Sequence, residues 1–154
     1  MGKIIKLFNK KILLNNENMT NYARGRNVEY KVRDLFKENG YHVMRSAGSK
    51  FPDLFVLKQV KINNDEEIEG EKEEKTKQFG FYIECKKSTS PLSDEEKEKA
   101  KKLEEKTGFP LKVAVREKDP DDKRKTIIVF YEKDDTTRIK QEKILHPEKY
   151  ENKE

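Results

Sequence analysis

The chain has a single cysteine, Cys85, among its 154 residues. One cysteine excludes an internal disulfide and any zinc site built from several thiolates, and it is typical of a reducing compartment. No apolar run approaches the roughly 20 residues that a membrane-spanning helix needs. The basic start of the chain also has no long apolar stretch and no small-residue cleavage site of the kind found in signal peptides. We therefore expect a cytoplasmic protein with no membrane partner.

Hydrophobic residues are scarce as well, at 32% against 42% charged residues. This composition leans toward disorder, but the apolar residues gather in short runs, which indicates a small core under a highly charged surface. The charge is uneven, because residues 1–50 carry 11 Lys/Arg and 4 Asp/Glu, whereas the remainder carries 24 and 26. A basic first third favours a polyanionic partner, and a solvated lysine-rich surface is the alternative.

The apolar pattern predicts one α/β domain over residues 20–134, with the order helix, three strands, helix, two strands. The predicted helices cover residues 20–39 and run from a capping box at Ser93 to about Thr107; the predicted strands cover 41–45, 52–60, 78–87, 111–116 and 126–131. Residues 1–19 are a basic extension, and residues 61–77 are a charged insertion expected to form a mobile hairpin tip. Residues 135–154 are a polar tail, expected to be frayed.

Two of the apolar strands carry acids where burial is costly. Asp53 follows Pro52 at the start of one strand, and Glu84 lies inside the other. An unpaired buried carboxylate is strongly unfavourable, so each acid is expected to have a partner or a cation. Strand alternation places Glu84 and Lys86 on one face and Cys85 on the other. Glu84 and Lys86 therefore project side by side.

These residue types suit hydrolysis of a phosphodiester. Mg²⁺, with Mn²⁺ as a substitute, takes one or two carboxylates and keeps several waters, so Asp53 and Glu84 are the predicted ligands. The main-chain carbonyl of Cys85 is a third candidate, and Lys86 can orient the attacking water or stabilise charge on the phosphate. Glu29 borders the buried face of the first helix, where it can hold a metal-bound water. The alternative for Glu29 is an ion pair with Arg33 one turn along the helix.

Pro-Asp followed about thirty residues later by Glu-x-Lys is a moderately specific signal, because each half alone is common in a chain rich in lysine and glutamate. The alternative is that Asp53 caps a turn and that Glu84 and Lys86 form a surface pair. The arrangement resembles the PD-(D/E)xK nuclease superfamily, and residues 24–131 resemble the archaeal-type Holliday junction resolvases. The matching stretches are residues 24–29, 40–49, 52–54 and 83–86, with a weaker match at 108–115; Arg-Ser-Ala-Gly-Ser at 45–49 is the most specific.

The resemblance implies a restriction-endonuclease-like core, with a central mixed β-sheet flanked by helices. It implies a homodimer with two active sites that resolves four-way DNA junctions in recombination and repair, in the cytoplasm of an archaeal or viral source and associated with the nucleoid. The implied catalytic residues are Glu29, Asp53, Glu84, Lys86 and Ser49, and the implied metal site combines Asp53, Glu84, Glu29 and Cys85. The implied DNA-binding residues are Arg24, Arg26, Arg45, Ser46 and Lys50.

The chain departs from this family in three respects. It has no clear match for the polar helix residue, often glutamine, that the family tends to carry after Glu-x-Lys. The 61–77 insertion is longer than expected, and the second helix is less apolar than the family's usual dimer surface. Two alternatives therefore stay open. One is another PD-(D/E)xK enzyme, such as a restriction or repair endonuclease acting on duplex or branched DNA. The other is a DNA-binding module with an idle site.

Overall fold

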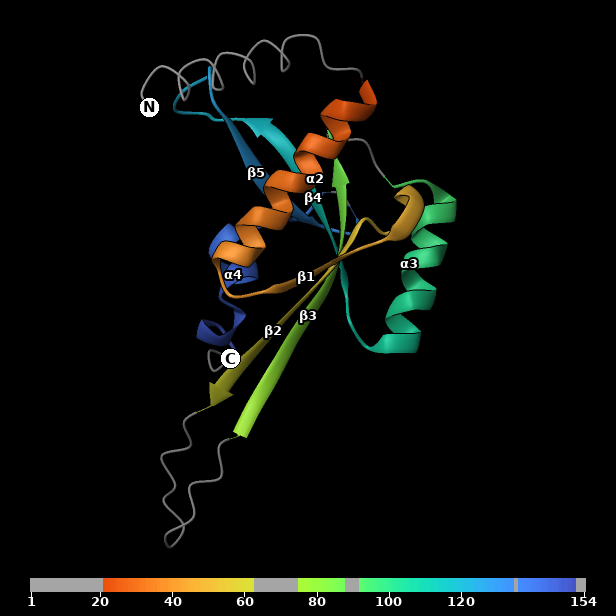
Figure 1. Ribbon diagram of the computed structural model, residues 1–154, viewed down its shortest axis with the longest axis vertical. Helices are drawn as coiled ribbons and strands as arrows, with labels where there is room; N and C mark the ends of the chain where they lie inside the picture. The colour runs from red at the N-terminus through yellow and green to blue at the C-terminus, as the bar shows by residue number, and fades with distance from the viewer. Residues whose placement is uncertain (1–20, 63–74, 88–91, 135, 152–154) are drawn as a thin grey trace, which may run out of the picture.

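The computed structural model describes residues 21–62, 75–87, 92–134 and 136–151, so the predictions for residues 1–19 and for most of the 61–77 insertion lie outside it. The described residues form a mixed sheet in the order β1-β2-β3-β4-β5-β6, flanked by helices (Figure 1). The strands are β1 (His42–Arg45), β2 (Leu54–Ile62), β3 (Lys75–Lys86), β4 (Leu111–Lys118), β5 (Thr126–Glu132) and β6 (Arg138–Ile139). The helices are α2 (Asn21–Glu38), α3 (Asp94–Thr107) and α4 (Gln141–Leu145), with single 3-10 turns η1 (Ala47–Ser49) and η2 (Pro147–Lys149). The predicted α/β class with a central mixed sheet is confirmed.

The first predicted helix is confirmed as α2. Its apolar stripe recurs every four residues, at Val28, Val32 and Phe36, and all three side chains are buried. The helix ends where Gly40 takes a left-handed conformation with φ of 87°, which a glycine adopts without steric cost. The Phe36 ring then contacts the edge of the Tyr41 ring, with 5.0 Å between centroids. This contact sets the direction in which the chain enters β1.

Neighbouring strands of the described sheet are antiparallel except for β3 and β4, and this parallel pair positions the site. Strands β1, β2 and β3 form an antiparallel meander, but β4 lies parallel to β3. A parallel pair needs a crossover connection, and α3 provides it. The predicted capping box is confirmed at the start of α3, where Ser93 and Glu96 cap each other's backbone N–H groups, and Gly108 ends the helix with φ of 77°. The crossover therefore brings the start of α3 close to the end of β3.

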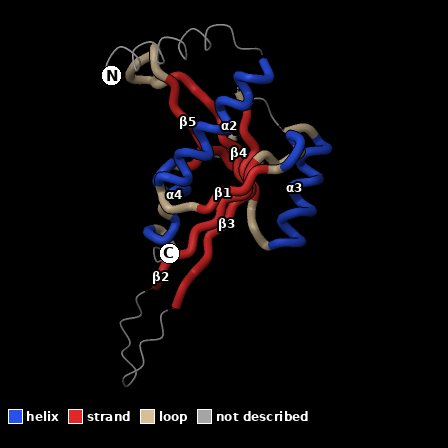
Figure 2. The backbone as a smooth tube through the Cα atoms, in the orientation of Figure 1, coloured by secondary structure: helices blue, strands red, loops and turns tan. Residues whose placement is uncertain are grey.

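Each face of the sheet carries its own core, and Figure 2 shows α2 and α4 on one side of the strands and α3 on the other. On one face, α2 and α4 cover Ile83 and the side chains of its strand neighbours, with Phe81 and Cys85 packed against them. On the other face, Ala100 of α3 packs with Leu111, Val113 and Val115 of β4, and Tyr82 packs against this group. The predicted alternation along β3 is thus confirmed, and Glu84 and Lys86 belong to the α3 face.

The predicted frayed tail is wrong for residues 136–151. The chain forms β6, pairs it with β5, and then forms α4, whose Ile144 and Leu145 are buried in the α2-side core. The Tyr41 hydroxyl donates a hydrogen bond of 2.7 Å to the Ile144 carbonyl. Two apolar residues in a five-residue helix are too few for a periodic signal, so only the tertiary packing reveals this element.

The boundaries of the long hairpin also differ from prediction. Strand β2 begins at Leu54, not at Pro52, and the β2–β3 ladder continues as far as the pair Ile62 and Lys75, inside the predicted insertion. In Figure 1 this hairpin extends away from the rest of the molecule. The residues that extend the ladder, Lys61 paired with Thr76 and Ile62 paired with Lys75, carry no apolar alternation, which is why the sequence indicates an insertion there.

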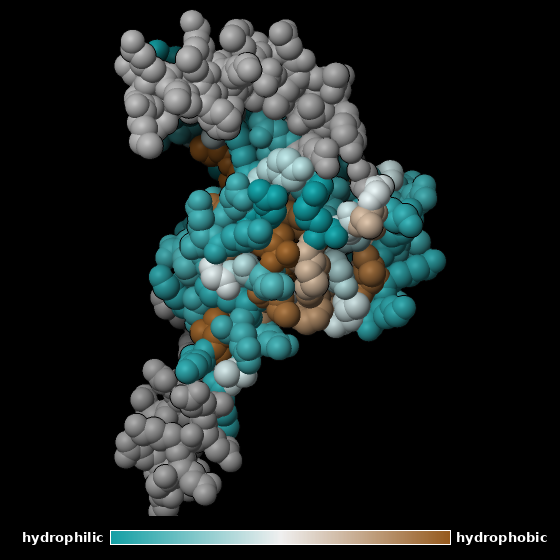
Figure 3. Space-filling model, in the orientation of Figure 1, coloured by the Kyte–Doolittle hydropathy of each residue, from teal (hydrophilic) through white to brown (hydrophobic). Residues whose placement is uncertain are grey.

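Much of the visible surface is hydrophilic (Figure 3), interrupted by an apolar band over β1 and beside α3. Met44 of β1 is the exposed large hydrophobic residue in the part of the chain that the structure describes. No helix among the described residues is both long and apolar enough to cross a membrane.

Candidate active site

Asp53 is fixed by the loop that joins β1 to β2. The Ser46 N–H donates a hydrogen bond of 3.0 Å to the Asp53 carbonyl, and the Ser46 hydroxyl donates to the carbonyl of Pro52, which follows a cis peptide bond. The β2–β3 ladder ends at the pair Leu54 and Ile83. Beyond this pair, the Cys85 N–H donates a hydrogen bond of 2.9 Å to Oδ2 of Asp53. The Asp53 carboxylate therefore continues the contact between the two strands where the backbone pairing stops.

Glu84 is a buried charged side chain, with only 7% of its surface exposed. Burial raises the pKa of its carboxyl well above the usual value, and the hydrogen bond and negative charge of Asp53 raise it further, followed by the charge of Glu96. In the absence of a cation, Glu84 is thus the protonated member of the group. Its carboxyl hydrogen-bonds to the carboxyls of both Asp53 and Glu96.

Lys86 completes the group on the same face of β3. Its Nζ lies 3.4 Å from Oε1 of Glu96, which belongs to the first turn of α3. Although burial opposes the shift, the Ser93 N–H and the Lys86 ammonium lower the pKa of Glu96. Sequence reasoning missed Glu96 as a site residue because the capping box already explained it. Its place in the first turn after the Glu84-x-Lys86 strand is the signal that could have found it.

Glu29 lies on the other face of the sheet, on α2. It forms an ion pair with Nε of Arg45, whose guanidinium also lies 5.1 Å from the centroid of the Tyr30 ring. The alternative that paired Glu29 with Arg33 is wrong, because Arg33 pairs with Asp34. Burial raises the pKa of the Cys85 thiol, and the charges of Asp53, Glu84 and Glu29 raise it further. The structure thus pairs Glu29 with Arg45 on the α2 side and does not bring it together with Asp53 and Glu84 on the α3 side.

Three of the five predicted DNA-binding residues lie at the end of β1 or in the loop that follows it. Arg45 keeps 38% of its side chain exposed, and Lys50 is exposed as well. The hydroxyl of Ser46 donates a hydrogen bond to the Pro52 carbonyl. Ser46 therefore holds the two ends of the loop together beside Asp53. Gly48 takes a left-handed conformation with φ of 68°. The side chains of Ser49, Arg24 and Arg26 lie outside the described part of the structure.

The donor set can be tested against the requirements of Mg²⁺. Among the described residues, no group of three or more His, Cys, Asp or Glu side chains is placed to hold a metal ion. Asp53 and Glu84 form a pair, however, and Mg²⁺ takes as few as one or two carboxylates. The carbonyl of a strand residue projects to the same side as its N–H, so the Cys85 carbonyl lies on the edge of β3 that faces Asp53, past the end of the ladder. Two carboxylates and one carbonyl fit an ion that keeps its remaining waters.

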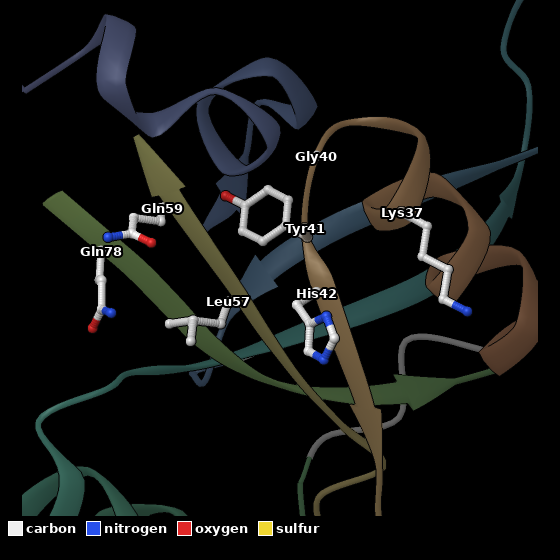
Figure 4. A pocket seen from close by; sticks show the side chains of 7 residues that line it. All are labelled: Lys37, Gly40, Tyr41, His42, Leu57, Gln59 and Gln78. Carbon is white, nitrogen blue, oxygen red and sulfur yellow. The ribbon is translucent and has the colours of Figure 1, made fainter. Parts of the chain in front are cut away.

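A surface hollow lies apart from this group. It measures about 500 Å³ and is lined by Lys37, Gly40, Tyr41, His42, Leu57, Gln59 and Gln78 (Figure 4). Leu57 and Gln59 lie four and six residues along from Asp53, toward the far end of the hairpin. No carboxylate lines this hollow. The acids that carry the predicted chemistry therefore lie away from it, at the opposite end of β2.

Comparison with protein-family models, with curated proteins and with solved structures finds no match for this chain.

Proposed function

We propose that this protein is a Mg²⁺-dependent endodeoxyribonuclease with a restriction-endonuclease-like core. The observation that carries the proposal is the meeting of Asp53, Glu84 and Lys86 at one end of the β2–β3 hairpin. Asp53 precedes β2 and Glu84 lies on β3, the two carboxyls hydrogen-bond to each other, and the lysine projects from the same face as Glu84. A buried pair of acids that raises the pKa of one member is typical of a functional site.

Asp53, Glu84 and the Cys85 carbonyl would hold the Mg²⁺, or Mn²⁺ in its place. The ion supplies charge neutralisation for the phosphate and lowers the pKa of a bound water. Lys86 then orients the attacking water or stabilises charge on the phosphate oxygens. Glu29, which pairs with Arg45 on the α2 side, is assigned on the resemblance alone to orienting a water of the ion. Each of these roles uses a residue that the sheet or α2 already positions.

The proposed substrate is a four-way DNA junction cut during recombination and repair. The support is the resemblance of residues 45–49, together with the exposed Arg45 and Lys50 beside Asp53. Recognition of DNA by its shape and phosphates needs basic surface more than base-reading motifs. Paired nicks on a two-fold junction need two symmetric active sites, so the proposal includes a homodimer. It also places the protein in the cytoplasm, on the nucleoid.

A cleavage assay tests the proposal. A labelled four-way junction and a linear duplex of the same sequence are incubated with the protein in Mg²⁺, in Mn²⁺ and in EDTA. Paired, symmetric nicks on the junction in either metal, and none in EDTA, are the expected result. Equal cutting of the duplex would point to a different PD-(D/E)xK nuclease. Binding without cleavage of either DNA would point to a DNA-binding module with an idle site.

A further inference from the structure

The ammonium of Lys86 pairs with Glu96 on α3 and not with Glu84, its neighbour on β3. Lys86 and Glu84 lie two residues apart on the same face of β3, yet the ion pair of Lys86 is with Glu96 on α3, at 3.4 Å. Both partners are partly withdrawn from water, with 18% and 27% of their side chains exposed. An ion pair in such surroundings is screened less than one on the open surface. Lys86 is thus held toward α3.

The Glu96 side chain is held in place by Ser93, the residue that caps α3. Its Oε1 accepts a hydrogen bond of 3.0 Å from the Ser93 N–H, while its own N–H donates one of 3.1 Å to the Ser93 hydroxyl. The helix that carries Glu96 is anchored in the α3-side core by Ala100, next to the buried Leu92. The oxygen that faces Lys86 therefore belongs to a rigid helix start, and its position does not depend on Lys86.

We propose that Glu96 is a positioning residue that holds Lys86 off Glu84 and so keeps the Asp53–Glu84 pair available to a divalent cation. Glu84 lies two residues away on the same face of β3 and hydrogen-bonds to Asp53, so without the charge on Glu96 the ammonium of Lys86 can turn toward these two predicted metal ligands. An ammonium paired with them would compete with Mg²⁺ for the same oxygens. This inference rests on the proposed function, because it assigns Asp53 and Glu84 to a metal.

The ion pair is tested first in the absence of metal and DNA. Glu96→Gln removes the charge and keeps the capping box, which accepts glutamine at this position. In a double-mutant cycle with Lys86→Met, measured by urea unfolding in EDTA, the expected coupling changes the unfolding equilibrium constant by about threefold. Additive effects of the two substitutions would show that Glu96 does not hold Lys86, and would overturn the proposal.

The consequence for the cation is tested by titrating Mg²⁺ without DNA and following the melting temperature. In Glu96→Gln the Mg²⁺ concentration that gives half of the stabilisation is expected to rise at least about fivefold. The double variant Glu96→Gln with Lys86→Met is expected to return to the wild-type value, because the competing ammonium is gone. The proposal would be overturned if the Mg²⁺ midpoint of Glu96→Gln equalled that of the wild-type protein. It would also be overturned if the double variant had a midpoint as high as that of Glu96→Gln.

Ser93→Ala is the matched control. It removes the hydroxyl half of the capping box and leaves Glu96 and Lys86 in place, so it should lower the melting temperature without moving the Mg²⁺ midpoint. A moved Mg²⁺ midpoint in this control would assign the effect to the helix start and overturn the proposal.

Failure of the proposed function gives a different set of results. A wild-type protein that neither cuts DNA nor responds to Mg²⁺ overturns that function and the cation part together, while the metal-free cycle still decides whether Glu96 holds Lys86.

Discussion

Oδ2 of Asp53 accepts a hydrogen bond of 2.9 Å from the backbone N–H of Cys85. This contact ties the acid before β2 to the strand that carries Glu84 and Lys86, at the point where the backbone ladder ends. It also places the Cys85 carbonyl on the edge of β3 that faces Asp53. One side-chain contact thus sets the relative position of the residues that the proposed chemistry needs.

Asp53→Asn and Glu84→Gln should each abolish DNA cleavage and preserve binding. Each substitution removes one carboxylate that the proposal assigns to Mg²⁺ and also reduces repulsion with the phosphate. We expect the cleavage rate to fall at least about 100-fold, with junction affinity equal to or above that of the wild-type protein. Single-turnover cleavage and gel-shift assays measure the two quantities separately.

Glu95→Gln is the control for this pair of variants, because Glu95 lies on the exposed side of α3 and pairs with Lys99. It should cut at the wild-type rate. Near-normal cleavage by either Asp53→Asn or Glu84→Gln would show that the metal site is assigned to the wrong residues.

The metal-free protein should lose stability as the pH rises. Glu84 has its pKa raised by burial and then by Asp53, from an ordinary value of 4.5. Above that pH the unfolded chain releases a proton that the folded protein keeps, so the stabilising contribution is full below about pH 4.5 and declines up to the raised pKa. The slope reaches at most about 1.4 kcal/mol per pH unit.

Glu84→Gln cannot titrate at this position and should flatten that decline. Urea unfolding in EDTA between pH 5 and pH 8 measures the slope for both proteins. Identical slopes in the wild-type protein and in Glu84→Gln would show that Glu84 does not keep its proton in the folded state.

Arg45→Ala should weaken DNA binding and make it less dependent on salt. The Arg45 side chain is partly exposed at the end of β1, and loss of one phosphate contact reduces the slope of log K against log salt by about 0.9. Arg33→Ala is the matched control, because Arg33 also lies over the Tyr30 ring, at 4.7 Å, but pairs with Asp34. Equal slopes for Arg45→Ala and the wild-type protein would count against a phosphate contact.

Ile144→Ala should destabilise the whole domain. The side chain is 2% exposed and packs in the core under α2, where removal of such a side chain costs about 2–5 kcal/mol. Lys143→Ala, on the exposed side of the same helix, should change the free energy of unfolding by less than about 0.5 kcal/mol. Equal effects in the two variants would mean that α4 does not contribute to the core.

Residues with strong local signals were predictable from the sequence. The stripe of Val28, Val32 and Phe36 identified α2, and the capping box at Ser93 located the start of α3 within one residue. Alternation along β3 placed Glu84 and Lys86 on one face. These features depend on periodicity or on a few neighbouring residues, so the chain itself carries them.

Contacts between distant residues were not predictable in this way. Helix α4 holds only two buried residues, and the partner of Glu29 proved to be Arg45, sixteen residues away, and not Arg33 on the same helix. The capping box accounted for Glu96, so its ion pair with Lys86 was not predicted. In each case the deciding interaction joins separate elements, and helix or strand periodicity gives no information about it.

The long β2–β3 hairpin separates the end of the sheet that holds Asp53 and Glu84 from the connection at residues 63–74. The nine residues of β2 extend about 25 Å, with Asp53 just before the first and the pair Ile62 and Lys75 at the other end. A change in the length of the 63–74 connection can therefore affect Asp53 and Glu84 only through the β2–β3 ladder, which is paired from Leu54 and Ile83 to Ile62 and Lys75. The connection is a natural place for a fluorescent label or an affinity tag, because a probe inserted there would leave the spacing between Asp53 and Glu84 unchanged.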